Sequence, residues 1–243
     1  MATAHPQITV LTGAGISTDS GIADFRGPNG VWTRNPGAEK LFDIDHYRHD
    51  PELRRRSWQA RRENPAWGAE PNAGHRALVD LERTGHLRAV VTQNIDRLHQ
   101  RAGSSPALVL ELHGNMVESV CLGCGAEGLT RDALARLDAG EEDPACDRCG
   151  GILKTATVMF GQTLDPDVLD AATQAAADAD VFVAVGTTLQ VHPAAGLCDV
   201  AVSHGASLII VNADPTLYDD LADRILCGPI STSLPTLLHE LVS

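Results

Sequence analysis

Residues Val10–Gly27 read VLTGAGISTDSGIADFRG, and this stretch decides the fold. An apolar run that ends at Leu11 leads directly into a glycine-rich turn at residues 13–15, as a strand leads into a phosphate-binding loop. The dinucleotide fingerprint G-x-G-x-x-G needs a third glycine for close helix packing, and Thr18 stands in its place. Two interpretations therefore stay open, a dinucleotide-binding loop and a simple glycine turn.

Short runs rich in Val, Ile and Leu recur along the chain and predict buried strands of a parallel sheet. These runs are ITVLT, LRAVVT, ALVLEL, DVFVAVG, SLIIVN and RILC. Helix-like stretches lie between several of them, at residues 72–84, 165–179, 193–203 and 232–241. Strands that alternate with helices are typical of a doubly wound α/β sheet, which is the fold class we predict.

Two segments interrupt this alternation. Residues 35–71 are polar and helix-prone, and residues 115–154 carry four of the six cysteines. Both segments lie between sheet elements, so we expect them to pack together as a second, smaller domain. Residues 1–34, 72–114 and 155–243 then form the large domain.

The composition excludes several classes of function. A net charge of −13 gives no general attraction to phosphate backbones or anionic lipids, and only 4% of the residues are aromatic, which leaves little for base stacking. We therefore expect neither a nucleic-acid nor a membrane partner. The amino-terminal segment MATAHPQITVLTG has neither a basic region nor a long apolar stretch, so we expect a cytoplasmic protein. The oligomeric state is open, with a monomer favoured.

Four cysteines form two C-x-x-C pairs, Cys121 with Cys124 and Cys146 with Cys149, close to the spacing of a zinc ribbon. Four thiolates leave no open position for water, so this pattern predicts a structural zinc ion. A redox pair or four unrelated thiols are the alternatives. The two remaining cysteines, at positions 198 and 227, are interpreted as small core residues.

Polar residues follow the predicted strands, where ligands bind in open α/β sheets. These residues are Gln93, Asn94, Ile95 and Asp96 after the second run, His113 after the third, Gly186, Thr187 and Thr188 after the fourth, and Asn212 and Asp214 after the fifth. Each one taken singly is also a common helix cap or turn residue. Their convergence with the loop at Gly13 favours a binding site.

One histidine is placed to do chemistry. His113 is adjacent to a glycine at the mouth of the predicted cleft, where an imidazole can act as a general base near neutral pH. A structural role is the alternative. The acidic residue that usually binds a ribose about 20 positions after the first glycine has only Glu39 as a counterpart, in polar surroundings, so Asn212 is the better candidate.

Taken together, the motifs resemble those of the sirtuins of bacterial type, which are NAD-dependent protein-lysine deacylases. The motifs GAGIS, GIADFRG, TQNIDRLH, LHGN, the two C-x-x-C pairs, GTTLQVHPAAGL and VNADP follow the order and approximate spacing of that family. The resemblance covers nearly the whole chain. It implies a Rossmann-like large domain, a small zinc-binding domain, and a cleft between them for NAD and an acyl-lysine protein or peptide.

The resemblance also implies roles for individual residues. His113 matches the general base, and Asn94 and Asp96 belong to the nicotinamide pocket with Gln93 and Ile95. The remaining positions implied to bind NAD are Gly13, Ala14, Gly15, Asp24, Phe25, Arg26, Gly186, Thr187, Thr188, Asn212, Asp214 and Ile230. Val158, Met159, Phe160 and Gly161 are implied to pair with the substrate peptide as an added strand.

The implied reaction moves the acyl group from lysine to ADP-ribose and releases nicotinamide, free lysine and an O-acyl-ADP-ribose. In it, the amide oxygen attacks the ribose carbon, and His113 then deprotonates a ribose hydroxyl. A mono-ADP-ribosyltransferase that uses the same NAD site and a non-catalytic zinc and nucleotide module are the alternatives. The presence of all three residues Asn94, Asp96 and His113 argues against the non-catalytic module.

The chain departs from the family pattern at several positions. Ala23 replaces a common Pro, Gln162 replaces a common Glu, and LKTATV replaces a stretch that often contains Arg-Pro. Some members bind acidic acyl groups through a Tyr-x-x-Arg pair, for which this chain has Trp58 and Arg61. These two residues are candidates for an acyl pocket, and a solvated helix face with Trp58 packed beneath it is the alternative. We expect acetyl or longer apolar acyl groups to be preferred over succinyl.

Overall fold

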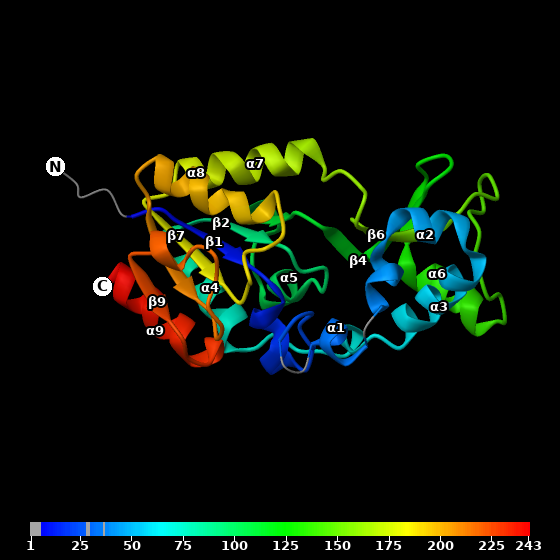
Figure 1. Cartoon of the computed structure of the whole chain (residues 1–243), viewed down its shortest axis with the longest axis horizontal. Coiled ribbons are helices and arrows are strands. Elements are labelled where there is room, and N and C mark those ends of the chain that lie inside the picture. Colours follow the sequence, from blue (N-terminus) through cyan, green and yellow to red (C-terminus); the bar gives the residue numbers. More distant parts are fainter. Residues whose placement is uncertain (1–5, 28–29, 36) are drawn as a thin grey trace.

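A computed structural model describes residues 6–27, 30–35 and 37–243. Its large part is built on a six-stranded parallel sheet in the order β3-β2-β1-β7-β8-β9 (Figure 1). The strands are β1 (Ile8–Thr12), β2 (Leu87–Thr92), β3 (Val109–Glu111), β7 (Val181–Val185), β8 (Ser207–Val211) and β9 (Arg224–Leu226). Each of the six predicted runs contains one of these strands. The predicted doubly wound α/β sheet is confirmed.

Helices cover both faces of the sheet. The pair α4 (Ala73–Arg83) and α9 (Ile230–Val242) packs on one face through residues such as Leu78 and Leu237, and the pair α7 (Pro166–Ala177) and α8 (Leu197–Ser203) packs on the other (Figure 1). The central strands are buried on both sides, which explains their continuous apolar sequence. The sheet therefore supplies a rigid edge on which strand-end residues are fixed.

The prediction of burial is wrong for the last strand. β9 is one of the two edge strands of the sheet, and its residue Ile225 is 41% exposed. Cys227, which follows β9, is exposed rather than a core residue, whereas Cys198 is buried in α8 as predicted. An edge strand has neighbours on one side only, so its side chains and those just after it face solvent.

At the other end of the molecule lies a smaller unit, here called the small lobe (Figure 1). Its antiparallel sheet has the order β5-β4-β6. The elements are α2 (Ile44–His49), α3 (Pro51–Arg62), β4 (Gly114–Cys121), β5 (Glu127–Leu129), α6 (Thr130–Asp138) and β6 (Leu153–Thr157). Among the described residues, no helix is long and apolar enough to cross a membrane.

Short helical elements lie between the strands and the longer helices. They are the 3-10 helices η1 (Ala14–Ser20), η2 (Ala38–Phe42), η3 (Pro65–Trp67), η4 (Pro106–Leu108), η5 (Ala194–Gly196) and η6 (Asp219–Leu221), and the helices α1 (Val31–Arg34) and α5 (Leu98–Ala102). The loop after β1 therefore continues as a 3-10 helix, not as the long α-helix of a standard dinucleotide-binding unit.

Candidate active site

One large cleft of about 1280 Å³ lies between the carboxyl edge of the parallel sheet and the small lobe. Apart from the four paired cysteines, every residue that the sequence assigned to a site lines this cleft, with the exception of Trp58. Two walls can be distinguished. The sheet-edge wall consists of residues that follow β1, β2, β3 and β7, and the lobe wall contains Phe25, Trp32, Phe42, Phe160 and Arg61.

The sheet-edge wall begins where two glycine turns meet. The Gly15 amide donates a hydrogen bond to the Gly186 carbonyl at 2.9 Å, and a Cβ on Gly186 would lie 2.5 Å from the Ile16 nitrogen. Gly186 also has a φ of +60°, which disfavours other residues. A Cβ on Gly13 would lie 2.6 Å from the Gly186 oxygen. The close backbone approach therefore involves Gly186, which follows the neighbouring strand β7, whereas Thr18 is exposed.

Next to this turn, a chain of hydrogen bonds fixes the residues that follow β2. The Ser17 hydroxyl donates to Asp96 at 2.7 Å, and the Asn94 side-chain amide donates to the Gly13 carbonyl at 3.0 Å. Gln93 donates to the Thr187 hydroxyl at 3.0 Å. Burial raises the pKa of Asp96, and the hydrogen bonds from Leu98 and Ser17 oppose that rise. Ser17 was missed as a site residue, although it belongs to the GAGIS motif.

His113 lies in the turn between β3 and β4 and faces the same cleft. Its Nδ1 lies 3.0 Å from the Gln93 carbonyl oxygen, so Nδ1 carries the proton and donates it to that carbonyl. The other ring nitrogen, Nε2, is then an unprotonated base. Burial lowers the pKa of His113, and this keeps the imidazole neutral and basic near pH 7. The His113 carbonyl accepts a hydrogen bond from Val158 at 2.8 Å, which ties the base to the predicted peptide segment.

The loop after η1 contributes an aromatic cluster to the lobe wall. The ring of Trp32 lies 5.0 Å from Phe25 and 5.8 Å from Phe160, and the Arg26 guanidinium lies 4.4 Å above it. Phe42 completes the cluster at 5.7 Å from Phe25. Asp24 accepts a hydrogen bond from the Gly27 amide at 2.9 Å. Trp32 and Phe42 were not anticipated, because they lie in polar sequence surroundings that carry no motif.

The predicted peptide segment contains two residues, Met159 and Phe160, whose backbone groups are already paired. The Phe160 amide donates to the Phe42 carbonyl at 2.7 Å, and its carbonyl accepts from Ile44 at 3.0 Å. The Met159 amide donates to the Gln162 side-chain oxygen at 3.1 Å, and its carbonyl accepts from the Gln162 amide at 3.0 Å. The Val158 amide is bonded to His113, so among the described residues of this segment the Val158 carbonyl and the backbone of Gly161 remain for an added strand. Phe160 instead offers its ring, which is 46% exposed.

The substrate role proposed for Trp58 is wrong. Trp58 is fully buried in a cluster with Ala133 and Leu137 of α6, and it does not line the cleft. Arg61 does reach the cleft, where its Nε donates to the Thr155 hydroxyl at 2.9 Å and its Nη1 bonds to the Ser57 hydroxyl. The α3 face thus packs its indole against the neighbouring helix, as the alternative interpretation of the sequence stated.

Lys154 of the unusual LKTATV stretch is buried away from the cleft. Its ammonium group donates to the carbonyls of Thr155 and Thr157, at 2.9 and 2.5 Å. Burial and the nearby charge of Arg61 lower the pKa of Lys154 to about 8. This side chain therefore supports the backbone of β6.

The far end of the cleft is formed by the residues after β8 and by the start of α9. The Asn212 side chain donates to the Asp214 carbonyl at 2.7 Å, and Ile230 is the first residue of α9. All three residues line the cleft, whereas Glu39 does not. This arrangement agrees with the choice of Asn212 over Glu39 as the ribose candidate.

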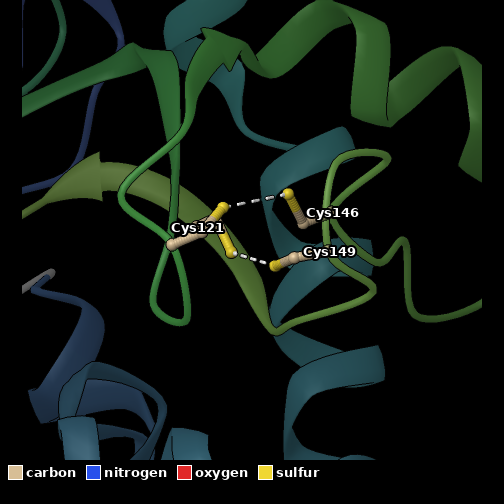
Figure 2. A group of neighbouring side chains, drawn as sticks. Cys121, Cys146 and Cys149 are labelled. Carbon is tan, nitrogen blue, oxygen red and sulfur yellow. Dashed lines mark hydrogen bonds between the residues drawn. The ribbon is translucent and has the colours of Figure 1, made fainter.

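The four paired cysteines form a separate cluster in the small lobe. Their sulfur atoms all lie within 4.8 Å of one another, with Cys121 and Cys149 at 3.5 Å and Cys124 and Cys146 at 3.8 Å. Figure 2 shows the sulfurs of Cys121, Cys146 and Cys149 pointing toward a common centre. A tetrahedral zinc site with Zn–S bonds of about 2.3 Å requires sulfur separations of roughly 3.8 Å. The cluster fits a structural zinc ion.

Comparisons with known proteins agree with this geometry. A model of the Sir2 family matches residues 13–193. The NAD-dependent protein deacetylase 2 of Streptomyces coelicolor is 59% identical over 239 residues, which cover 98% of this chain and 99% of that protein.

Solved structures give the same result. A structure described as Sir2 with a p53 peptide and NAD+ has a TM-score of 0.85 at 38% identity and covers 96% of this chain and 92% of its own. Another, described as Sir2 with a deacetylated p53 peptide and 3'-O-acetyl ADP ribose, has a TM-score of 0.88 at 38% identity, with coverage of 98% and 94%. These similarities extend over both the parallel sheet and the small lobe.

Proposed function

This chain belongs to the Sir2 family and is an NAD-dependent protein-lysine deacylase, and from that premise we propose that His113, Asn94 and Asp96 carry its catalysis. The reaction removes the acyl group from lysine and yields nicotinamide and an O-acyl-ADP-ribose. One observation carries the assignment: His113 is fixed by the Gln93 carbonyl so that its basic Nε2 is free, at the edge where the glycine turns meet.

The base role of His113 has a simple electrostatic rationale. Burial lowers its pKa, so the imidazole remains unprotonated at neutral pH and can accept a proton from a ribose hydroxyl. Its Nδ1 hydrogen bond stabilises the imidazolium that forms, because the Gln93 carbonyl dipole points at the protonated ring. A positioned base of this kind accounts for about 10²- to 10⁴-fold in rate.

The residues after β2 suit the carboxamide of nicotinamide. Asp96 offers a carboxylate that Ser17 and the Leu98 amide hold in one orientation, and Asn94 is anchored to the Gly13 carbonyl. Groups that are held before the ligand arrives lose little entropy on binding. When bound, NAD supplies the ribose carbon that nicotinamide leaves and that receives the acyl oxygen.

The glycine turns suit the pyrophosphate. Gly13, Ala14 and Gly15 open η1, and the backbone amides at such a turn favour a phosphate group. Thr187 and Thr188 extend this surface toward the ribose, and the residues at Asn212, Asp214 and Ile230 border the adenosine end. The loop residues Asp24, Phe25 and Arg26 close over the nicotinamide ribose.

The acyl-lysine peptide lies along the segment from Val158 to Gly161, where the Val158 carbonyl and the Gly161 backbone accept and donate its hydrogen bonds, with the aromatic cluster enclosing its acyl chain. Such a wall suits an acetyl or a longer apolar group. Two of the Arg61 nitrogens already donate to Thr155 and Ser57, which lowers its value as a partner for a succinyl carboxylate.

We propose that the chain has two domains. Residues 1–34, 72–114 and 155–243 form the NAD-binding domain, and residues 35–71 and 115–154 form the zinc-binding domain. A cytoplasmic monomer that binds neither nucleic acid nor membrane is the state we propose. Metal analysis of the folded chain is expected to give one zinc per chain, and a folded sample without zinc would contradict the cysteine assignment.

A panel of acetyl, propionyl, long-chain and succinyl lysine peptides, each incubated with and without NAD, tests the function. We expect NAD-dependent loss of the acetyl and apolar acyl groups, measured by mass spectrometry, together with one nicotinamide for each lysine released. Acyl removal that proceeds equally without NAD would refute the function. Succinyl removal that exceeds acetyl removal would refute the proposed acyl preference alone.

A further inference from the structure

Two buried imidazoles lie behind the sheet-edge wall. His75 of α4 and His99 of α5 are 0% and 1% exposed, and their ring centroids lie 5.0 Å apart. Neither ring lines the cleft. Burial lowers the pKa of His75 to about 4 and that of His99 to about 3, so both rings are neutral in the folded protein. Each ring then has one N–H donor and one acceptor nitrogen.

The hydrogen bonds of each ring determine its tautomer. The Asn72 amide donates to His75 Nδ1 at 3.3 Å, so His75 carries its proton on Nε2. The Thr12 hydroxyl donates to the Thr92 hydroxyl at 2.9 Å and therefore accepts from His99 Nε2 at 3.0 Å. His99 also carries its proton on Nε2.

These tautomers leave two complementary atoms without a partner. His75 Nε2 is a buried donor and His99 Nδ1 is a buried acceptor, and neither has a hydrogen-bond partner among the described residues. The hydroxyl of Ser104 is a third such atom, and the Ser104 amide donates to the His99 carbonyl at 3.1 Å. The centroids of the two rings that carry the nitrogens lie 5.0 Å apart, a separation comparable with the span of about 5.6 Å that two hydrogen bonds through one water cover. Buried polar groups of this kind are the usual partners of an internal water.

On either side, the two imidazoles are attached to the cleft. The Asn72 side chain donates to the Ile16 carbonyl at 2.8 Å and to the Ser20 hydroxyl at 3.0 Å, which ties His75 to η1. On the other side, the Thr92 hydroxyl accepts from the Asn94 amide at 3.1 Å, which ties His99 to the residues that follow β2. These hydrogen bonds, here called the path, thus connect η1 to the residues after β2 on the side of the sheet-edge wall that faces away from the cleft.

We propose that His75 and His99, bridged by one internal water that Ser104 also binds, are positioning residues that fix η1 relative to Asn94. The proposal rests on the proposed function, because it assigns these residues to the nicotinamide half of the NAD site. A neutral imidazole both donates and accepts a hydrogen bond. It can therefore hold η1 and the residues after β2 in a fixed relative position without adding a buried charge. His113 is held separately, by Gln93 and Val158.

The tautomers are tested directly by nitrogen-15 NMR of histidine-labelled full-length protein at pH 7. We expect His75 and His99 both as the Nε2–H form, with slowly exchanging protons. A Nδ1–H tautomer at either residue would overturn the bridge, because the two unpartnered atoms would no longer be a donor and an acceptor.

Variant kinetics test the positioning role. H99L removes both polar atoms of the ring, whereas H99Q keeps one donor and one acceptor. We expect H99L to raise the KM for NAD and the inhibition constant of nicotinamide about three- to tenfold, the range expected for a lost buried hydrogen bond, with kcat and the peptide KM within about twofold. H99Q is expected to restore most of the affinity. The pair H75L and H75Q repeats the test, since Gln is a natural capping residue at that helix position.

A stability-matched core variant separates positioning from packing. Leu237 of α9 is fully buried outside the cleft, so L237A lowers the melting temperature without touching the path. If H99L and L237A, assayed well below their melting temperatures, share the wild-type KM for NAD, the positioning role is refuted. If the wild-type chain itself shows no NAD-dependent turnover, the proposed function fails instead, and the tautomer measurement still decides the bridge.

Discussion

The two walls of the cleft are built in different ways. In the sheet-edge wall, backbone and short polar groups are in direct contact, as between Gly15 and Gly186 at 2.9 Å and between Ser17 and Asp96 at 2.7 Å. In the lobe wall, aromatic rings such as Phe25 and Trp32 meet at 5.0 Å. Direct hydrogen bonds and backbone contacts fix the positions of the groups in the sheet-edge wall. Rings that only pack against one another can shift slightly in position. This difference agrees with the proposed division of roles, in which the sheet-edge wall carries the chemistry and the small lobe selects the acyl group.

Loss of the base should have the largest effect. H113A is expected to lower kcat about 10²- to 10⁴-fold, because no other described side chain holds an unprotonated nitrogen at that point of the sheet-edge wall. The melting temperature and the zinc content should stay close to wild type. A mass-spectrometric peptide assay measures the rate, and residual turnover above a tenth of wild type would contradict the assignment.

The glycine contact comes next. G186A places a Cβ 2.5 Å from the Ile16 nitrogen at a positive φ, and it should cost about 2–4 kcal/mol of unfolding free energy, with weaker NAD binding. G21A is the matched control: Gly21 has a φ of +85°, but a Cβ there meets nothing within 4 Å. Urea unfolding should give only about 1 kcal/mol for G21A. Equal losses of unfolding free energy in G186A and G21A would show that the close contact between Gly186 and the loop after β1 is unimportant.

Acid should weaken the region behind the sheet-edge wall. The folded-state pKa values of about 4 for His75 and about 3 for His99 lie below the unfolded value near 6.5, so the unfolded chain binds more protons between these limits. Their contribution is complete above pH 6.5 and falls by up to about 1.4 kcal/mol per pH unit for each residue as the pH drops toward 4. Urea unfolding at several pH values measures the slope, and H99Q should flatten it. An unchanged slope in H99Q would refute the assignment.

The smallest effect is expected in the lobe wall. R61M removes the hydrogen bonds to Thr155 and Ser57 but keeps the apolar stem, so kcat/KM for an acetyl peptide should change less than about threefold. R62M, at an exposed neighbouring arginine outside the cleft, is the control. A loss of tenfold or more in kcat/KM for R61M alone would show that the lobe wall contributes to the chemistry.

The sequence predicted the sheet-edge wall well because parallel strands end at one edge, so residues after separate runs had to meet. It did not reveal that Gly186 contacts the Gly13 loop, because the order of the strands in the sheet depends on the whole fold and cannot be predicted from any one segment. Trp58 was misassigned because helix periodicity gives a face but not the element, here α6, that covers it. His75 and His99 were assigned no role, although His99 ends the motif TQNIDRLH, because their hydrogen-bond partners come from separate segments of the chain.

The fate of NAD tests the central claim most directly. Full-length protein, an acetyl-lysine peptide and NAD labelled in its adenine half are incubated together, and the label is followed by mass spectrometry. We predict that the label leaves as O-acetyl-ADP-ribose, with one nicotinamide and one free lysine for each molecule formed. Label that accumulates on protein without lysine release would contradict the account and identify an ADP-ribosyltransferase.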